Sequence, residues 1–289
     1  MATRTPLYPL VSTAWLGERL SDGDLRIFDA TVHLRPSSTG VYTAESGRAD
    51  YEAGHIPGAA FADLLSELSD PTSDLRFTLP SVPALEAALS RLGLSERHTC
   101  VVYSTASPMW ATRLRWMLHA LGCTHTFVLD GGFTKWRAEG RPVATGREQY
   151  PPATFTATFD ARRWADREEV LAAIGDGGVC TINALTASVH AGTSQTNYGR
   201  KGHIAGSVNV PFPALLQADG TLAAPEALRA AFDAAGALSA PRKICYCGGG
   251  IAATLNALAL ELIGHTDVAV YDGSLSEWSR DPTLPMQSG

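Results

Sequence analysis

The chain contains an internal repeat, and this feature limits its possible folds more than any other. Three short motifs occur twice, in the same order and at nearly constant spacing, which indicates two copies of one structural unit. At 289 residues the chain is long enough for two domains, one for each copy. The matching pairs are Gly54–Ala59 with Gly202–Ser207, Val101–Ser104 with Ile244–Cys247, and Leu129–Trp136 with Tyr271–Trp278.

Within each copy, short apolar runs rich in β-branched residues alternate with longer stretches of helical periodicity. This alternation predicts an α/β fold, in which a mainly parallel sheet has helices on both faces. We expect an N-terminal domain over residues 1–146, a linker over Thr145–Thr156 and a C-terminal domain over residues 157–289. Strands are predicted at Arg26–Asp29, Cys100–Ser104, Thr126–Leu129, Val179–Asn183, Lys243–Tyr246 and Val268–Tyr271, and helices at Ala84–Leu92, Ala111–Leu121, Arg167–Ile174, Pro225–Ala235 and Ala253–Leu262.

Cys247 lies between a predicted strand and a predicted helix, and three glycines follow it at once. Ligands of parallel α/β sheets bind beyond the carboxyl ends of the strands, which is where this thiol would lie. Because the free N–H groups and the positive dipole end of a helix stabilise an anion, we expect the thiolate to be populated near neutral pH. Glycines also allow several N–H groups to turn toward one atom. The predicted cradle for a bound sulfur or oxyanion consists of Gly248, Gly249, Gly250, Ile251 and Ala252.

Composition excludes several classes of partner. A formal charge of -6 and a pI near 5.7 argue against nucleic acid and anionic membranes, and no apolar run approaches the roughly 20 residues that span a bilayer. Five cysteines without the spacing of a disulfide framework point to the reducing cytoplasm. No pattern of metal ligands is present, so we expect neither a metal nor a cofactor. The cysteines expected to be structural are Cys100, Cys123, Cys180 and Cys245.

The repeated motifs and the glycine loop resemble the tandem-domain rhodanese family of sulfurtransferases, across nearly the whole chain. The resemblance implies two rhodanese-like domains, of which the first is catalytically inactive and the second forms a persulfide on its cysteine at the cleft between them. The first copy agrees, because Ser104 stands where the second copy has Cys247. Trp110, in this degenerate segment, is the aromatic residue that we expect to line the cleft.

The resemblance also implies a sulfur transfer in two steps. A small anionic donor would leave its outer sulfur on Cys247, and a thiol, cyanide or a thioredoxin-like protein would then remove it. The loop Cys-Gly-Gly-Gly-Ile-Ala is closer to the Cys-Gly-Ser-Gly-Val-Thr of 3-mercaptopyruvate enzymes than to the Cys-Arg-Lys-Gly-Val-Thr of thiosulfate enzymes. We therefore expect 3-mercaptopyruvate first and thiosulfate second, with another anionic sulfur donor left open.

Residues of the family's substrate site are partly replaced. In the proton-relaying triad of mercaptopyruvate enzymes, Gly249 takes the place of the serine and Ser46, next to Glu45, takes the place of the aspartate. The histidine is retained as His55, which the resemblance places at the cleft.

The carboxylate clamp of the family is also changed. The motif Asp-x-Arg-x-x-x-Arg corresponds to Asn183–His190, which lacks both arginines. The nearest replacement cations are Arg200 and Lys201, which are expected either to bind the donor or to be solvated loop charges.

Two alternatives from other classes remain. The fold also occurs in phosphatases, but their Cys-x5-Arg loop requires an arginine where this chain has Ala253. A noncatalytic binding or regulatory module is the stronger alternative, because several substrate contacts are missing. The retained cysteine among three glycines favours the enzyme.

Overall fold

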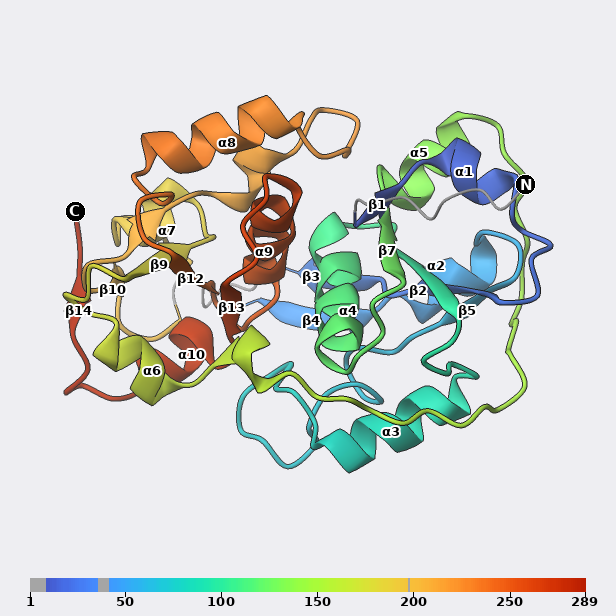
Figure 1. Ribbon diagram of the computed structural model, residues 1–289, viewed down its shortest axis with the longest axis horizontal. Helices are drawn as coiled ribbons and strands as arrows, with labels where there is room; N and C mark the ends of the chain where they lie inside the picture. The colour runs from blue at the N-terminus through green and yellow to red at the C-terminus, as the bar shows by residue number, and fades with distance from the viewer. Residues whose placement is uncertain (1–8, 36–41, 197) are drawn as a thin grey trace.

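The computed structural model has two α/β halves side by side (Figure 1) and describes residues 9–35, 42–196 and 198–289. Residues 1–8, 36–41 and 197, most of which fall in the predicted N-terminal domain, lie outside the described residues. Each half contains a five-stranded sheet in which all neighbouring strands are parallel. The predicted α/β fold class with two similar domains is confirmed.

The two sheets have the same strand order. The sequence predicted their central strands within one residue, because buried parallel strands are short apolar runs. The outer strands have two or three residues and show no such pattern. The first sheet runs β5 (Ala59–Phe61), β2 (Leu25–Asp29), β6 (Thr99–Tyr103), β7 (Thr126–Leu129) and β1 (Leu10–Val11); the second runs β11 (Val208–Asn209), β9 (Val179–Asn183), β12 (Arg242–Tyr246), β13 (Val268–Tyr271) and β8 (Trp164–Ala165).

Two short antiparallel pairs complete the strands, and helices flank the sheets. The pairs are β3 (Val32–Arg35) with β4 (Thr43–Ser46) and β10 (His203–Ile204) with β14 (Met286–Gln287). The helices are α1 (Thr13–Gly17), α2 (Arg48–Ala53), α3 (Val82–Arg91), α4 (Pro108–Ala120), α5 (Gly132–Ala138), α6 (Arg167–Ala172), α7 (Ala187–His190), α8 (Pro225–Ala234), α9 (Ala252–Leu262) and α10 (Ser274–Trp278), with single 3-10 turns at Ala161–Arg163 and Phe212–Leu215. Among the described residues, none of these helices has the length and apolarity needed to cross a membrane.

Helices α4 and α9 pack against each other at the centre of the molecule and join the halves (Figure 1). Helix α9 is buried on all sides over Ala252–Leu260, as expected for a helix with apolar residues around its whole circumference. Near the start of both helices, the Thr112 and Thr254 hydroxyls hydrogen-bond across the interface at 2.7 Å. The halves are therefore in direct contact beside the loop that follows Cys247.

The predicted linker packs along the first half. Tyr150 donates a hydrogen bond to the Gly58 carbonyl at 2.5 Å, and Phe155 is buried in the core. The segment is thus held by side-chain contacts and is not a free tether. The domain boundaries stay a prediction.

Candidate functional site at Cys247

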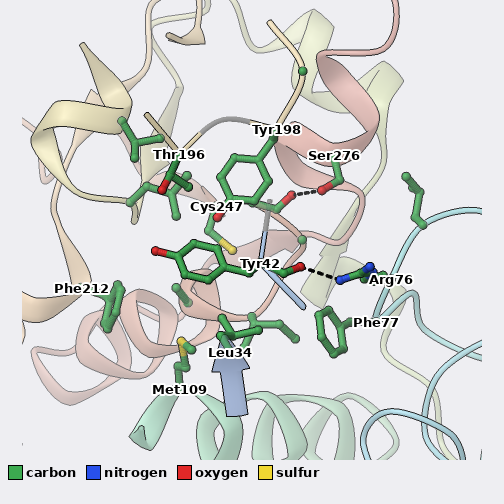
Figure 2. Close-up of a pocket in the computed structure, with 18 of the residues that line it drawn as sticks. Leu34, Tyr42, Arg76, Phe77, Met109, Thr196, Tyr198, Phe212, Cys247 and Ser276 are labelled. Carbon is green, nitrogen blue, oxygen red and sulfur yellow. Dashed lines mark hydrogen bonds between the residues drawn. The ribbon is translucent and has the colours of Figure 1, made fainter. Parts of the chain in front are cut away.

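Cys247 immediately follows β12, and the loop after it leads into α9, as the sequence predicted. The thiol is buried, with 2% of the residue exposed, and it lines a cavity of about 800 Å³ (Figure 2). Within the described residues, the backbone N–H groups of Gly248, Gly249, Ile251 and Ala252 donate to no other group. These donors remain available to an anion bound at the sulfur.

Ser274 holds the two ends of this loop. Its buried hydroxyl accepts hydrogen bonds from the N–H groups of Cys247 and Gly250, both at 3.1 Å, and donates to the Tyr271 carbonyl at 2.7 Å. The residue has a φ of 49°, which is rare outside glycine. The corresponding position of the first half is Gly132, with a φ of 55°. Both copies thus have a left-handed residue at this position. Only the second copy, whose loop contains the cysteine, has a serine hydroxyl there that hydrogen-bonds to the loop.

The three glycines are not equivalent. Gly250 has a φ of 71°, and a Cβ atom there would lie 2.7 Å from the Asp272 carbonyl oxygen, so this position requires glycine. A Cβ atom at Gly248 would overlap the ring of Tyr198. At Gly249 the nearest atom to a Cβ would be the Arg76 carbonyl oxygen at 3.7 Å, an ordinary contact. Without movement of Tyr198, a side chain therefore fits only at the middle position.

Arg113, on α4 of the first half, connects this loop to the rest of the cleft. The guanidinium is buried, pairs with Asp272 at 2.7 Å and donates to the Gly250 carbonyl at 3.2 Å and the Phe77 carbonyl at 2.6 Å. Phe77 has a φ of 64°. Among the described residues, it and Ser274 are the two non-glycine residues with a positive φ, and backbone strain of this kind is typical of functional sites.

Both halves contribute to the cavity, and its surface is mainly apolar and aromatic. Trp110 lines the cavity, as the sequence predicted, and the centroid of its ring lies 5.1 Å from that of the Phe77 ring. The first half supplies Leu34, Tyr42, Asp74, Leu75, Arg76, Phe77, Met109 and Trp110; the second supplies Leu185, Thr186, Val189, Ser194, Thr196, Tyr198, Gly199, Phe212, Ser276 and Arg280 together with the Cys247 loop.

The cations of the cavity are at exposed positions. Arg76 donates to the Tyr42 carbonyl at 2.7 Å, and Arg280 donates to the Asp74 carbonyl at 3.1 Å, so both are oriented by the loops of the first half. Each arginine has further N–H donors for an anion. The two positions of the family's arginine clamp, Leu185 and Val189, do lie on the cavity surface, but as apolar side chains.

The expectation that His55 faces the cleft is wrong. The ring is completely buried, stacks on Tyr51 with centroids 4.2 Å apart and has Nδ1 2.8 Å from the Tyr51 carbonyl oxygen. Its other nitrogen lies 3.4 Å from Glu148. The triad does not assemble either, because Ser46 is exposed on β4 and Glu45 pairs with Arg35 at 3.0 Å. None of these groups lines the cavity at Cys247.

Arg200 and Lys201 are also absent from the surface of the cavity at Cys247. The Arg200 guanidinium donates to four backbone carbonyls around the end of α10, those of Trp278, Ser279, Asp281 and Leu284, at 2.6 to 3.2 Å. Arg200 therefore fixes a loop to a helix instead of presenting a free cation. Lys201 is exposed and, with Arg200, lines a small neighbouring cavity that shares Val189 and Tyr198 with the cavity at Cys247.

The other four cysteines have the surroundings of structural residues. Cys100, Cys123 and Cys245 are buried, and Cys180 is half-buried. Burial raises the pKa of all four thiols, that of Cys123 to about 12. These thiols are therefore poor nucleophiles near neutral pH.

With this geometry in place, comparison with known proteins defines the family. The family model of the rhodanese-like domain matches residues 12–139 and 159–281. The thiosulfate sulfurtransferase of Rattus norvegicus is 37% identical over 94% of this chain and 92% of its own length, and thiosulfate/3-mercaptopyruvate sulfurtransferase 2 of Arabidopsis thaliana is 31% identical over 96% and 86%. The crystal structure of the 3-mercaptopyruvate sulfurtransferase SseA from Escherichia coli superposes with a TM-score of 0.83 at 29% identity, covering 92% of this chain and 98% of that one.

The chain belongs to the rhodanese family, and it is a sulfurtransferase with two rhodanese domains in tandem. Enzymes of this class act on a sulfur donor and a sulfur acceptor. The sequence alone did not indicate the surroundings of the thiol, namely Ser274, Arg113, Phe77 and Tyr198. The repeat did contain one signal for Ser274, because the second copy has this serine where the first copy has Gly132.

Proposed function

We propose that the protein transfers a sulfur atom from a small anionic donor to a thiophilic acceptor through a persulfide on Cys247. The main support is the position of the thiol on a large cavity, next to four backbone N–H groups that have no partner among the described residues. Such donors stabilise a developing sulfur anion without a charged side chain. The cradle of Gly248–Ala252 is the proposed binding site of the outer sulfur.

In the first half-reaction, the Cys247 thiolate attacks the outer sulfur of the donor and forms an S–S bond. With 3-mercaptopyruvate the carbon–sulfur bond breaks, its electron pair stays on carbon, and pyruvate forms after protonation. With thiosulfate the sulfur–sulfur bond breaks and sulfite leaves with the electron pair. Both routes leave the same enzyme persulfide, so covalent catalysis separates the transfer into two simpler displacements.

In the second half-reaction, an acceptor attacks the outer sulfur and the Cys247 thiolate leaves. Cyanide would give thiocyanate, and a small thiol or a thioredoxin-like protein would give a persulfide or, with a second thiol, a disulfide and sulfide. No redox cofactor is required, because each step passes the same sulfur atom from one nucleophile to another and the group that leaves keeps the electron pair of the broken bond.

The charges of the cavity support an anionic donor. Arg76 and Arg280 are exposed at its edge, where they would attract a carboxylate or sulfonate. The loop itself has no cation, since glycines occupy positions 248 and 249. This favours 3-mercaptopyruvate over thiosulfate, whose charge adjoins the transferred sulfur.

The first domain, over residues 1–146, is proposed to be catalytically inactive and to complete the cleft of the second, over residues 157–289. Ser104 takes the place of the nucleophile there. Five unpaired cysteines suit a protein of the reducing cytoplasm.

Intact-mass measurement tests the proposal. Purified protein is incubated separately with 3-mercaptopyruvate and thiosulfate, and we expect one added sulfur that cyanide removes. Cys247→Ser should show no added sulfur and an unchanged fold by circular dichroism, because a hydroxyl cannot form a persulfide. Turnover by the serine variant, or an added sulfur that maps to another cysteine, would show that the nucleophile is misassigned.

A further inference from the structure

Tyr198 occupies the space in which a side chain at position 248 would begin. A methyl group on Gly248 would overlap the Cε1 and Cζ atoms of this tyrosine and lie 2.5 Å from its hydroxyl oxygen. Figure 2 shows the ring beside Cys247, at the surface of the cavity. Within the described chain, the Tyr198 hydroxyl hydrogen-bonds to no other group and so remains available to a ligand.

The backbone at and after Tyr198 is held by hydrogen bonds. The Ser279 hydroxyl donates to the Tyr198 carbonyl. Two residues further on, the Arg200 guanidinium donates to four carbonyls around the end of α10. These contacts hold the backbone at Tyr198, so the ring can leave Gly248 only by turning about its own side-chain bonds, unless these hydrogen bonds break.

The electrostatic surroundings of the hydroxyl match a role beside an anionic sulfur. Burial raises the pKa of Tyr198 above its usual range, and the negative charge of a Cys247 thiolate adds to the effect. The hydroxyl therefore stays protonated at neutral pH and presents a neutral hydrogen-bond donor.

We propose that Tyr198 is the specificity-determining residue of this site and selects donors whose charge is remote from the transferred sulfur. The inference rests on the proposed persulfide chemistry. In the observed conformation the ring fills the space that a side chain at position 248 would need, so the cradle has a neutral aromatic cover in place of a cation.

The class of donor follows from where in the cavity the negative charge of the donor can be compensated. In a mercaptocarboxylate, the carboxylate is separated from the thiol by several bonds and can reach Arg76 or Arg280 at the edge of the cavity. In thiosulfate, the sulfonate is bonded directly to the transferred sulfur and must enter beside Cys247. There it meets Tyr198 and the apolar Leu185 and Val189, so neutral hydrogen-bond donors but no cation of the loop compensate its charge, and a dianion in such surroundings is disfavoured.

A double-mutant cycle tests the steric part of the proposal. Persulfide formation is followed in single turnover by intact mass for wild type, Gly248→Ala, Tyr198→Ala and the double variant. We expect Gly248→Ala to slow the reaction with both donors by about tenfold or more, and Tyr198→Ala in the same chain to restore the rate of Tyr198→Ala alone, since contacting residues are energetically coupled. Additive effects, or a Gly248→Ala protein as fast and as stable as wild type, would overturn the proposal.

Donor selection is tested with an arginine at the vacated position. In Tyr198→Ala with Gly248→Arg, the kcat/KM ratio of thiosulfate to 3-mercaptopyruvate should rise about tenfold over wild type, because a cation can then reach the sulfonate. Tyr198→Phe keeps the ring and removes only the hydroxyl, so the ratio should stay near the wild-type value if the ring itself, and not its hydrogen bond, sets the choice of donor. An unchanged ratio in the arginine variant would overturn the role of Tyr198 only. Absence of added sulfur on wild-type protein with either donor would instead overturn the sulfurtransferase proposal itself.

Discussion

Substitution of Ser274 separates two effects of this residue on the stability of the loop after Cys247: the hydrogen bonds of its hydroxyl and the strain of its backbone. The hydroxyl accepts from two N–H groups and donates to one carbonyl, and the residue is completely buried. In Ser274→Ala these three groups lose their partner while the left-handed φ of 49° remains. A buried polar group without a partner costs about 1 to 3 kcal/mol, so with partial relaxation we expect a loss of about 3 kcal/mol in the free energy of unfolding.

Ser274→Gly removes the same hydrogen bonds but tolerates the backbone conformation. Because a left-handed residue with a Cβ atom costs about 1 kcal/mol or more relative to glycine, this variant should be about 1 kcal/mol more stable than Ser274→Ala. Ser276→Ala is the matched control. Its hydroxyl makes one hydrogen bond to the Gly248 carbonyl, at 2.6 Å, and its loss should cost about 1 kcal/mol.

Urea denaturation measures the three stabilities, and persulfide formation in single turnover reports on the loop. Both Ser274 variants should form persulfide more slowly than Ser276→Ala, because two ends of the cradle are released. The reasoning fails if Ser274→Ala is no less stable than Ser276→Ala, or if the alanine and glycine variants at 274 unfold at the same urea concentration.

Three further predictions concern residues outside the cradle. Cys245→Ala should retain persulfide formation, because the thiol is buried in β12; loss of turnover at an unchanged melting temperature would indicate a redox role. Burial alone would raise the pKa of Glu261, but Arg115 and neighbouring basic groups outweigh it and lower the pKa to about 2. The pKa of this side chain in the unfolded chain is about 4.3, so its ionisation contributes about 3 kcal/mol to the free energy of unfolding. This contribution is present above pH 5 and is lost toward pH 2. In Glu261→Gln the urea midpoint should therefore change less with pH across this range than it does in the wild type. Arg200→Ala should lower the melting temperature and slow persulfide formation with both donors by releasing the Tyr198 segment; a rise in KM alone would instead support donor binding.

Local sequence determined the architecture and the place of the nucleophile. The repeat implied two similar halves, and the central strands and longer helices followed from hydrophobic periodicity, which depends on neighbouring residues along the chain. The segment from β12 through Cys247 to α9 was equally predictable from the sequence, because a cysteine followed by glycines at the start of a helix is more typical of a reactive thiol than of a core residue. Most strands of two to four residues and most helices of four to seven residues were missed, since such short segments contain at most about two periods of their pattern.

The surroundings of the thiol were decided only by tertiary structure. His55 and Tyr198 both lie far from Cys247 in sequence, and nothing local distinguishes a histidine that stacks on Tyr51 from one that faces a cleft. Arg200 has the charge of a donor-binding residue, yet its guanidinium donates four hydrogen bonds to carbonyls around a distant helix end. The periodicity of the sequence indicates which face of a helix or strand is buried. Which side chains meet across the cleft depends instead on how segments distant in sequence pack together. That packing determined how polar the cleft at Cys247 is.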